Sequence, residues 1–140
     1  MQSFIHRVKV FIYRFESTRP QYLLLRGDQG IESFWGPVHH DIALGEKLET
    51  AIRRGVMDDT GLGLPKRVLD LEMPERWCLG DEEVVEWNYG FHTEALDREL
   101  ELSARWADFQ WAHFEGAFSE LGFEHDRAAI TRLHTMLSMN

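Results

Sequence analysis

Four charged residues in the middle of the chain have the types and spacing that could hold a divalent cation: Glu46, Arg54, Asp58 and Asp59. Asp58 and Asp59 follow a run whose apolar residues recur with helical period, so we expect both carboxylates to continue the inward-facing stripe of a helix. They also fall in its last turn, where the negative end of the helix dipole disfavours acidic side chains by about 0.3–1 kcal/mol each. Two acids placed there require a nearby cation, either a basic side chain or a metal ion.

The helix that would position these residues is predicted for residues 46–60. Its apolar stripe consists of small and aliphatic residues at i, i+3, i+4, i+7 and i+8: Leu48, Ala51, Ile52, Gly55 and Val56. We expect Leu48, Ile52 and Val56 to be buried against a sheet. Gly61 follows at the position where a glycine commonly ends a helix.

Residues 35–62 resemble a Nudix box, whose family pattern is G-x5-E-x7-R-E-U-x-E-E-x-G-U, with U an aliphatic residue. The pattern places its first glutamate on Glu46, its arginine on Arg54 and its paired acids on Asp58 and Asp59 without a gap. Its second glycine and its two aliphatic positions are also matched, by Gly61, Val56 and Leu62.

The sequence departs from the family pattern at four positions. His40 stands in place of the first glycine, Gly55 in place of a glutamate, and aspartates replace the two remaining glutamates. Gly55 removes a carboxylate, and a glycine inside a helix costs roughly 0.5–1 kcal/mol relative to alanine. Gly55 reflects either drift after catalysis was no longer needed or a need for space beside a ligand or a neighbouring side chain. A Gly55→Glu change is expected to create or raise Mg²⁺-dependent activity.

The resemblance implies a pyrophosphohydrolase that uses Mg²⁺ or Mn²⁺ and acts on a nucleoside triphosphate or a related diphosphate-linked compound. Glu46, Asp58 and Asp59 would be its metal ligands, and these residues with Arg54 its catalytic set. Such a metal neutralises phosphate charge and positions the attacking water. Within the family, the chain is similar to bacterial nucleotide or dihydroneopterin triphosphate pyrophosphatases. The degenerate active site predicts weak or altered activity, and it leaves a second hypothesis open: a catalytically inactive Nudix-fold module that binds a ligand or has a regulatory role.

Three further residues are candidates for binding the substrate: Arg26, His39 and His40. Arg26 ends a predicted strand, where the family often has a basic residue near the substrate; a solvated strand end is the alternative. The sequence predicts that His39, His40 and Asp41 form a loop. Neighbouring histidines seldom bind one ion, and neither HxH nor HxxxH spacing is present, so a loop that contacts ligand or solvent is favoured over a transition-metal site.

The remaining elements follow from alternation and helical periodicity. We predict strands at residues 4–15, 21–26, 34–38, 67–72, 83–95 and 108–114, helices at 115–121 and 125–139, and a connection at 73–81. The first two strands should form a hairpin. This order is similar to the α/β (α+β) fold of Nudix domains, an α/β/α sandwich with a mixed sheet between helices.

Composition restricts the possible partners. The 140 residues, 44 % hydrophobic and 28 % charged, fit a single Nudix-like domain over residues 1–140. A net charge of −9 argues against binding to a nucleic-acid duplex or to an anionic membrane, so the expected partner is a small phosphorylated ligand. The absence of a signal-peptide pattern and the single cysteine, Cys78, predict a cytoplasmic location. The sequence leaves open whether the chain forms a homodimer.

Overall fold

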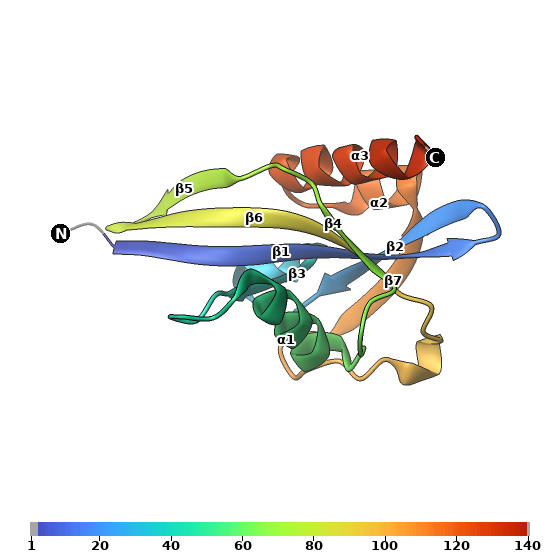
Figure 1. Ribbon diagram of the computed structural model, residues 1–140, viewed down its shortest axis with the longest axis horizontal. Helices are drawn as coiled ribbons and strands as arrows, with labels where there is room; N and C mark the ends of the chain where they lie inside the picture. The colour runs from blue at the N-terminus through green and yellow to red at the C-terminus, as the bar shows by residue number, and fades with distance from the viewer. Residues whose placement is uncertain (1–2, 140) are drawn as a thin grey trace.

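The computed structural model describes residues 3–139, and strand β1 (Ser3–Glu16) lies inside the sheet that they form (Figure 1). Along β1, Val8 and Val10 pack in one apolar cluster, whereas Phe11 and Tyr13 pack in another. A strand that is apolar on both faces has to lie between two covering layers. The alternation predicted from the sequence for this strand is therefore confirmed.

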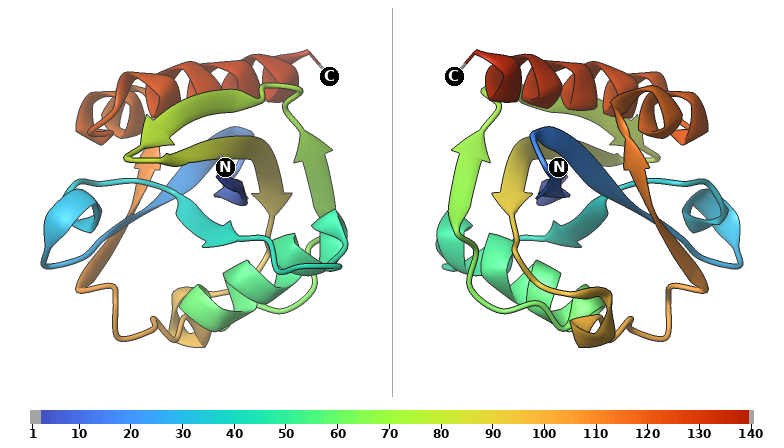
Figure 2. Two further views of the ribbon diagram at one scale, coloured as in Figure 1. Left: turned by 90° about the vertical axis from the view of Figure 1, so that its left-hand side faces the viewer. Right: turned by 90° about the vertical axis from the view of Figure 1, so that its right-hand side faces the viewer.

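The two covering layers are helical. Helix α1 (Leu48–Thr60) covers one face of the sheet, and helices α2 (Phe114–Glu120) and α3 (Glu124–Ser138) cover the other (Figures 1 and 2). Within α1, Ile52 and Val56 are buried and Leu48 is half-buried. Gly61 caps the helix in the left-handed conformation at φ 74°, and its N–H donates to the carbonyl of Met57. No helix of residues 3–139 combines the length and the apolar character that crossing a membrane would require.

The sheet is mixed because β1 has parallel and antiparallel neighbours. It pairs in parallel with β6 (Glu82–His92) and antiparallel with β2 (Arg19–Arg26) and β3 (Val38–Asp41). Three further strands extend the sheet: β4 (Arg67–Asp70) and β5 (Glu75–Leu79) on β6, and β7 (Asp108–His113) on β2. Two short 3₁₀ helices, η1 (Gly30–Ser33) and η2 (Asp97–Glu99), lie in the connections. The predicted hairpin and the predicted sandwich are both confirmed.

Two segments differ from the prediction. His39 and His40 lie in strand β3, where they pair with Lys9 and Val8 of β1, so the predicted loop at this position is wrong. The strand predicted over residues 34–38 is displaced: it begins at Val38, and Trp35 and Gly36 form only isolated bridges. Residues 75–79, predicted as part of a connection, form β5. Residues 38–41 are extended because they pair with β1, which is distant in sequence, a contact that local patterns do not show. β5 instead forms a tight hairpin with β6, in which Leu79 pairs with Glu82.

Candidate functional site

Helix α1 places its two C-terminal acids in different environments. Asp59 is buried, with 2 % of its surface exposed, whereas the Asp58 side chain is 57 % exposed. Successive helical residues are rotated by 100° about the axis, because one turn takes 3.6 residues, and only one of two neighbours can point into the core. The expectation that both carboxylates face inward was therefore wrong for Asp58.

Asp59 is held by three side chains from two other segments. His40 Nε2 lies 2.9 Å from Asp59 Oδ2, Arg105 Nη2 lies 3.3 Å from the same oxygen, and the Ser103 hydroxyl donates to Oδ1 at 3.0 Å. Burial by itself would raise the pKa of Asp59, but the hydrogen bond from His40 and the charge of Arg105 together lower this pKa below its usual value. Asp59 is consequently an ionised carboxylate whose compensating cation, Arg105, belongs to the protein.

The segment that carries Ser103 and Arg105 docks on the end of α1. The backbone N–H groups of Glu101 and Ser103 donate to the carbonyl oxygens of Thr60 and Asp59, at 2.8 and 3.0 Å. These bonds satisfy carbonyls that a helix leaves free in its last turn. They also fix Arg105, whose Nη2 donates to the backbone oxygen of His39 at 2.7 Å and whose guanidinium stacks on Trp106.

Glu46 and Arg54 form a two-point ion pair on the outer side of α1. Arg54 Nε lies 2.7 Å from Glu46 Oε2, and Arg54 Nη2 lies 3.0 Å from Glu46 Oε1. The hydrogen bonds from Arg54 are the main reason that the pKa of Glu46 falls to about 2. Asp58 Oδ2 is 3.9 Å from Arg54 Nη1, so Arg54 lies between the two acids.

The structure does not bring the three predicted metal ligands together. Glu46 is engaged by Arg54, Asp59 is engaged by His40 and Arg105, and no group of three or more metal-binding side chains converges within residues 3–139. A divalent ion needs several oxygen ligands around one point. To bind here it would have to displace a cationic side chain, so this arrangement of donors does not fit the metal that the fold implies.

Strand β3 directs its two histidines to opposite faces of the sheet, as alternation requires. His40 points to α1, where it contacts Asp59. His39 points to the other face, beside Glu32 and Trp106. Burial, with the nearby charges of Arg105 and Arg7, lowers the pKa of His39 to about 3, so its imidazole is neutral at physiological pH.

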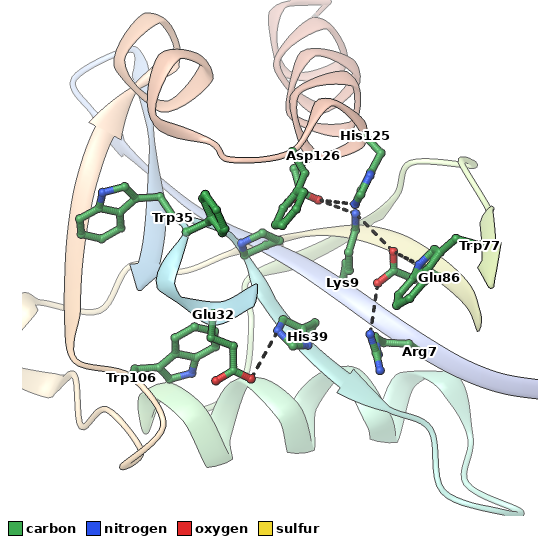
Figure 3. A pocket seen from close by; sticks show the side chains of 14 residues that line it. Arg7, Lys9, Glu32, Trp35, His39, Trp77, Glu86, Trp106, His125 and Asp126 are labelled. Atoms are coloured by element: carbon green, nitrogen blue, oxygen red, sulfur yellow. Dashed lines mark hydrogen bonds and ion pairs between the residues drawn. The ribbon is translucent and has the colours of Figure 1, made fainter. Parts of the chain in front are cut away.

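A cavity of about 340 Å³ lies on the face toward α3 (Figure 3). Its volume is within the range of small-molecule sites, roughly 300–1,000 Å³. Tryptophans from two segments, Trp77 of β5 and Trp106 from the connection before β7, stand on opposite sides of it (Figure 3). Of the three predicted binding residues, only His39 lines this cavity. Arg26 lies beside it, with its guanidinium 4.7 Å from the ring centre of Trp35, a lining residue.

The cavity contains a buried network of charged residues. Lys9 of β1, Glu86 of β6 and Asp126 at the start of α3 are 3–4 % exposed. Lys9 Nζ lies 2.5 Å from Asp126 Oδ1 and 3.8 Å from Glu86 Oε1, and the Trp77 indole N–H donates to Glu86 Oε1 at 2.9 Å. Arg7 Nη1 is 3.8 Å from Glu86 Oε2. These contacts appear as dashed lines in Figure 3.

The sequence analysis missed this network, although part of its signal was present. Arg7 and Lys9 occupy the same alternating row of β1 as Phe11 and Tyr13, which are buried. A charged residue in such a row must find a partner, because burying an unpaired charge is very costly. The partner of Lys9 could not be found in this way, since Asp126 is 117 residues away.

Comparison with known proteins identifies the fold. No protein-family model and no curated protein matches the sequence. Among solved structures, the Caenorhabditis elegans Ap4A hydrolase in a binary complex is 15 % identical, with a TM-score of 0.77 over 97 % of this chain and 99 % of that one. The Escherichia coli dihydroneopterin triphosphate pyrophosphohydrolase is 16 % identical, with a TM-score of 0.78 over 94 % and 95 %. The Nudix domain of Shewanella oneidensis NrtR, complexed with ADP-ribose, is 14 % identical, with a TM-score of 0.80 over 98 % and 90 %. The chain therefore has the Nudix fold.

Proposed function

We propose that this protein binds a nucleotide-like compound, a heteroaromatic ring that carries phosphate, and hydrolyses it slowly or not at all. The observation that carries the proposal is the pairing of Asp59 with His40 and Arg105, at 2.9 and 3.3 Å, next to an aromatic cavity. The cavity supplies a place for a ring, and the pairing occupies the carboxylate that hydrolysis would require.

The walls of the cavity support the binding part of this proposal. Trp77 and Trp106 both contribute to the cavity wall, and stacking on an aromatic side chain is worth about 1–3 kcal/mol for a nucleobase. The Nudix domain of NrtR, which shares this fold, was solved with ADP-ribose. A ligand with both a ring and phosphate groups matches these features better than a purely aliphatic compound does.

The ion pairs of α1 support the catalytic part. A carboxylate that already has hydrogen bonds with a histidine and a serine and an ion pair with an arginine has little capacity left for a cation. Glu46 is likewise bonded at both oxygens by Arg54. No step of hydrolysis can be assigned to these residues while they are paired in this way.

A metal-dependent pyrophosphohydrolase is the second candidate, and one observation favours it. Glu46 and Asp58 lie on either side of Arg54, at the spacing of the Nudix box, and the Asp58 side chain is largely exposed. A cation at high concentration could reach Asp58 without entering the core. This candidate predicts release of phosphate or pyrophosphate that depends on Mg²⁺ or Mn²⁺.

One pair of measurements tests both candidates. Nucleoside triphosphates, nucleotide sugars and dinucleoside polyphosphates are titrated against tryptophan fluorescence in EDTA, and phosphate release is then assayed with Mg²⁺ or Mn²⁺. We expect saturable binding with little or no turnover. Trp77→Leu should weaken binding, whereas Trp87→Leu, a matched change to a half-buried tryptophan outside the cavity, should not. Rapid metal-dependent turnover would favour the hydrolase, and failure of every compound to bind would refute the proposal.

A further inference from the structure

We propose that strand β4 and the groove beside it form a surface on which a second copy of this chain docks, through antiparallel pairing of β4 with β4 of that copy. The described residues that line the groove are different from those that line the aromatic cavity, so this inference is independent of the proposed function. Its basis is a free strand edge that borders exposed apolar side chains and a self-complementary pair of charges.

Strand β4 lies at one edge of the sheet. Of the strands that the structure describes, only β6 pairs with it, and both views in Figure 2 show β4 at the outer margin of the molecule. The N–H of Leu71 donates at 3.1 Å to the carbonyl of Asn88, the residue opposite it when the register of the two strands is continued. Because bonded and unbonded residues alternate along an antiparallel ladder, Leu69 is also bonded to β6, whereas the backbone groups of Val68 and Asp70 point away from it.

These backbone groups are arranged so that two copies can satisfy each other. Within residues 3–139, no backbone group outside the sheet bonds to the backbone of Val68 or Asp70. In an antiparallel pair related by a two-fold axis, Val68 of one copy can lie opposite Asp70 of the other, and the reverse then holds as well. Each of these opposed pairs exchanges two N–H···O=C hydrogen bonds. The faces also agree, because Val68 and Asp70 both border the groove on the α1 side of the sheet.

The side chains next to this edge leave apolar surface in water. A groove of about 570 Å³ lies between β4 and α1, lined mainly by aliphatic residues and by Tyr89. Leu64, which precedes β4, is 80 % exposed, and Val68 is 39 % exposed. An exposed apolar edge strand is a template for pairing with another chain. In the two-fold pair, the grooves of the two copies adjoin each other over the new strand pair, and both apolar side chains lose contact with water.

The charges on α1 favour a second copy over an unrelated strand. Glu49 and Arg53 lie one helical turn apart on the groove, with side chains 84 % and 53 % exposed and charged atoms 3.6 Å apart. A two-fold axis perpendicular to the sheet makes the two α1 helices antiparallel. Glu49 of each copy then faces Arg53 of the other, so opposite charges meet across the interface. The surface is therefore electrostatically complementary to itself.

Sedimentation equilibrium and amide hydrogen exchange of the unmodified protein test the inference. One short strand pair makes a small interface, so we expect monomers in dilute solution and dimers as the protein concentration approaches about 1 mM. The amide protons of Val68 and Asp70 should exchange more slowly in the concentrated sample, whereas those of Leu69 and Leu71, already bonded to β6, should change little. A protein that stays monomeric, or a dimer that leaves the amides of Val68 and Asp70 unprotected, would overturn the inference.

Two lysine variants compare two free edges of the same sheet. Val68→Lys places a charge in the interface and should lower the association constant at least about tenfold. Leu79→Lys is the matched control, because it replaces an exposed aliphatic residue of β5, which also pairs with β6. It should change the association constant by less than about twofold. Both side chains are exposed in the monomer, so both variants should fold. Equal losses of association in the two variants would contradict the assignment to β4.

A gain of association tests the register of the pairing. With Val68 opposite Asp70, the two Asp70 residues are diagonal neighbours, with Cα atoms about 7–8 Å apart, and their carboxylates repel each other. Asp70→Asn keeps the side-chain oxygen that accepts the N–H of Glu72 at 2.8 Å, and it should raise the association constant at least about threefold. Asp81→Asn lowers the net charge equally at an exposed position between β5 and β6, and its effect should be smaller. An equal rise in both variants would assign the gain to net charge and overturn this pairing.

Discussion

The imidazole of His40 fills the space next to Gly55. A Cβ atom built on Gly55 would lie 2.8 Å from Cδ2 of His40 and 3.0 Å from its Cγ, closer than side chains approach. The ring cannot swing away freely, because its Nε2 is 2.9 Å from the buried Asp59 carboxylate. His40 and Gly55 both depart from the Nudix box pattern, and the structure places these two residues in contact. Of the two explanations open for Gly55, space for a neighbouring side chain is the one supported.

This contact changes the outcome expected for Gly55→Glu. The sequence predicted that the variant would gain activity, whereas the structure predicts that it loses stability and gains no activity. Overpacking costs about 1–3 kcal/mol, and the better helix propensity of glutamate recovers less than about 1 kcal/mol of this. Urea unfolding of the variant and the parent protein measures the difference. Equal stability would show that His40 moves aside at little cost.

The double variant His40→Gly with Gly55→Glu should remove the clash. We expect it to be more stable than Gly55→Glu alone, since the new side chain occupies the volume that the imidazole leaves. It should also be the variant in which Mg²⁺-dependent phosphate release, if any appears, exceeds that of the parent. His40→Gly alone is the control, because it frees Asp59 without adding a carboxylate. Activity in that control equal to that of the double variant would assign no role to the acid at position 55.

The neighbouring acids Asp58 and Asp59 should respond very differently to the same substitution. Asp59→Asn leaves His40, Ser103 and Arg105 around a neutral amide in a buried site, and we expect it to cost about 1–3 kcal/mol of unfolding free energy. Asp58→Asn removes an exposed acid from the last helical turn, where the dipole disfavours it, and should change stability by less than about 0.5 kcal/mol. Thermal and urea unfolding of the two variants compare them directly. Similar losses of unfolding free energy in the two variants would mean that burial does not determine the effect of replacing Asp59.

Arg105 should limit the response of the protein to divalent ions. We expect Arg105→Leu to lower the unfolding free energy by about 1–3 kcal/mol, because the buried Asp59 carboxylate loses a charged partner. Mg²⁺ should then raise the melting temperature of the variant more than that of the parent, since part of the charge on Asp59 is no longer neutralised. Arg105→Lys, which keeps a positive charge, should respond as the parent does. An equal response to Mg²⁺ in all three proteins would contradict the role of Arg105 as an internal counter-ion.

The features that could be predicted from sequence are those set by local periodicity. The stripe of α1 and its cap at Gly61 depend on residues a few positions apart, and the two faces of β1 follow from simple alternation. Alternation also contained the information that adjacent histidines of a strand face opposite ways. This alternation could not be applied to His39 and His40, because β3 is extended through its pairing with β1, and the neighbouring sequence does not show that pairing.

The partners of the buried charges could not be predicted. Ser103 lies 44 residues after Asp59, in a connection without periodicity, and it reaches the helix through backbone hydrogen bonds. Lys9 and Asp126 meet because the start of α3 lies over β1 on one face of the sheet. A sequence shows that each charge needs a partner, but only the fold determines which one it obtains.

His39 should make the stability of the protein depend on pH above the range in which carboxylates titrate. Its pKa in the folded protein is about 3, mainly because of burial, against 6.5 for an ordinary histidine. Between these values the unfolded chain binds a proton that the folded protein excludes, so stability is complete above about pH 6.5 and falls as the pH falls toward 3. His92 and His134, whose pKa values are also lowered, act in the same direction. The stability that Asp59 and Glu46 contribute is present above their ordinary pKa values of 3.8 and 4.5, and it is lost only as the pH falls below them.

Urea unfolding between pH 7 and pH 4.5, compared for the parent protein and His39→Asn, isolates the share of His39. One excluded proton changes the unfolding free energy by at most about 1.4 kcal/mol per pH unit. The unfolding free energy of the variant should therefore depend less steeply on pH, by up to this amount. His92 and His134 are present in both proteins, so their contribution cancels in the comparison. The His39 imidazole proton resonances should also show no titration over this range in the folded parent. Equal slopes in the two proteins, or a midpoint near 6.5 for His39, would contradict a half-buried, neutral imidazole beside the cavity.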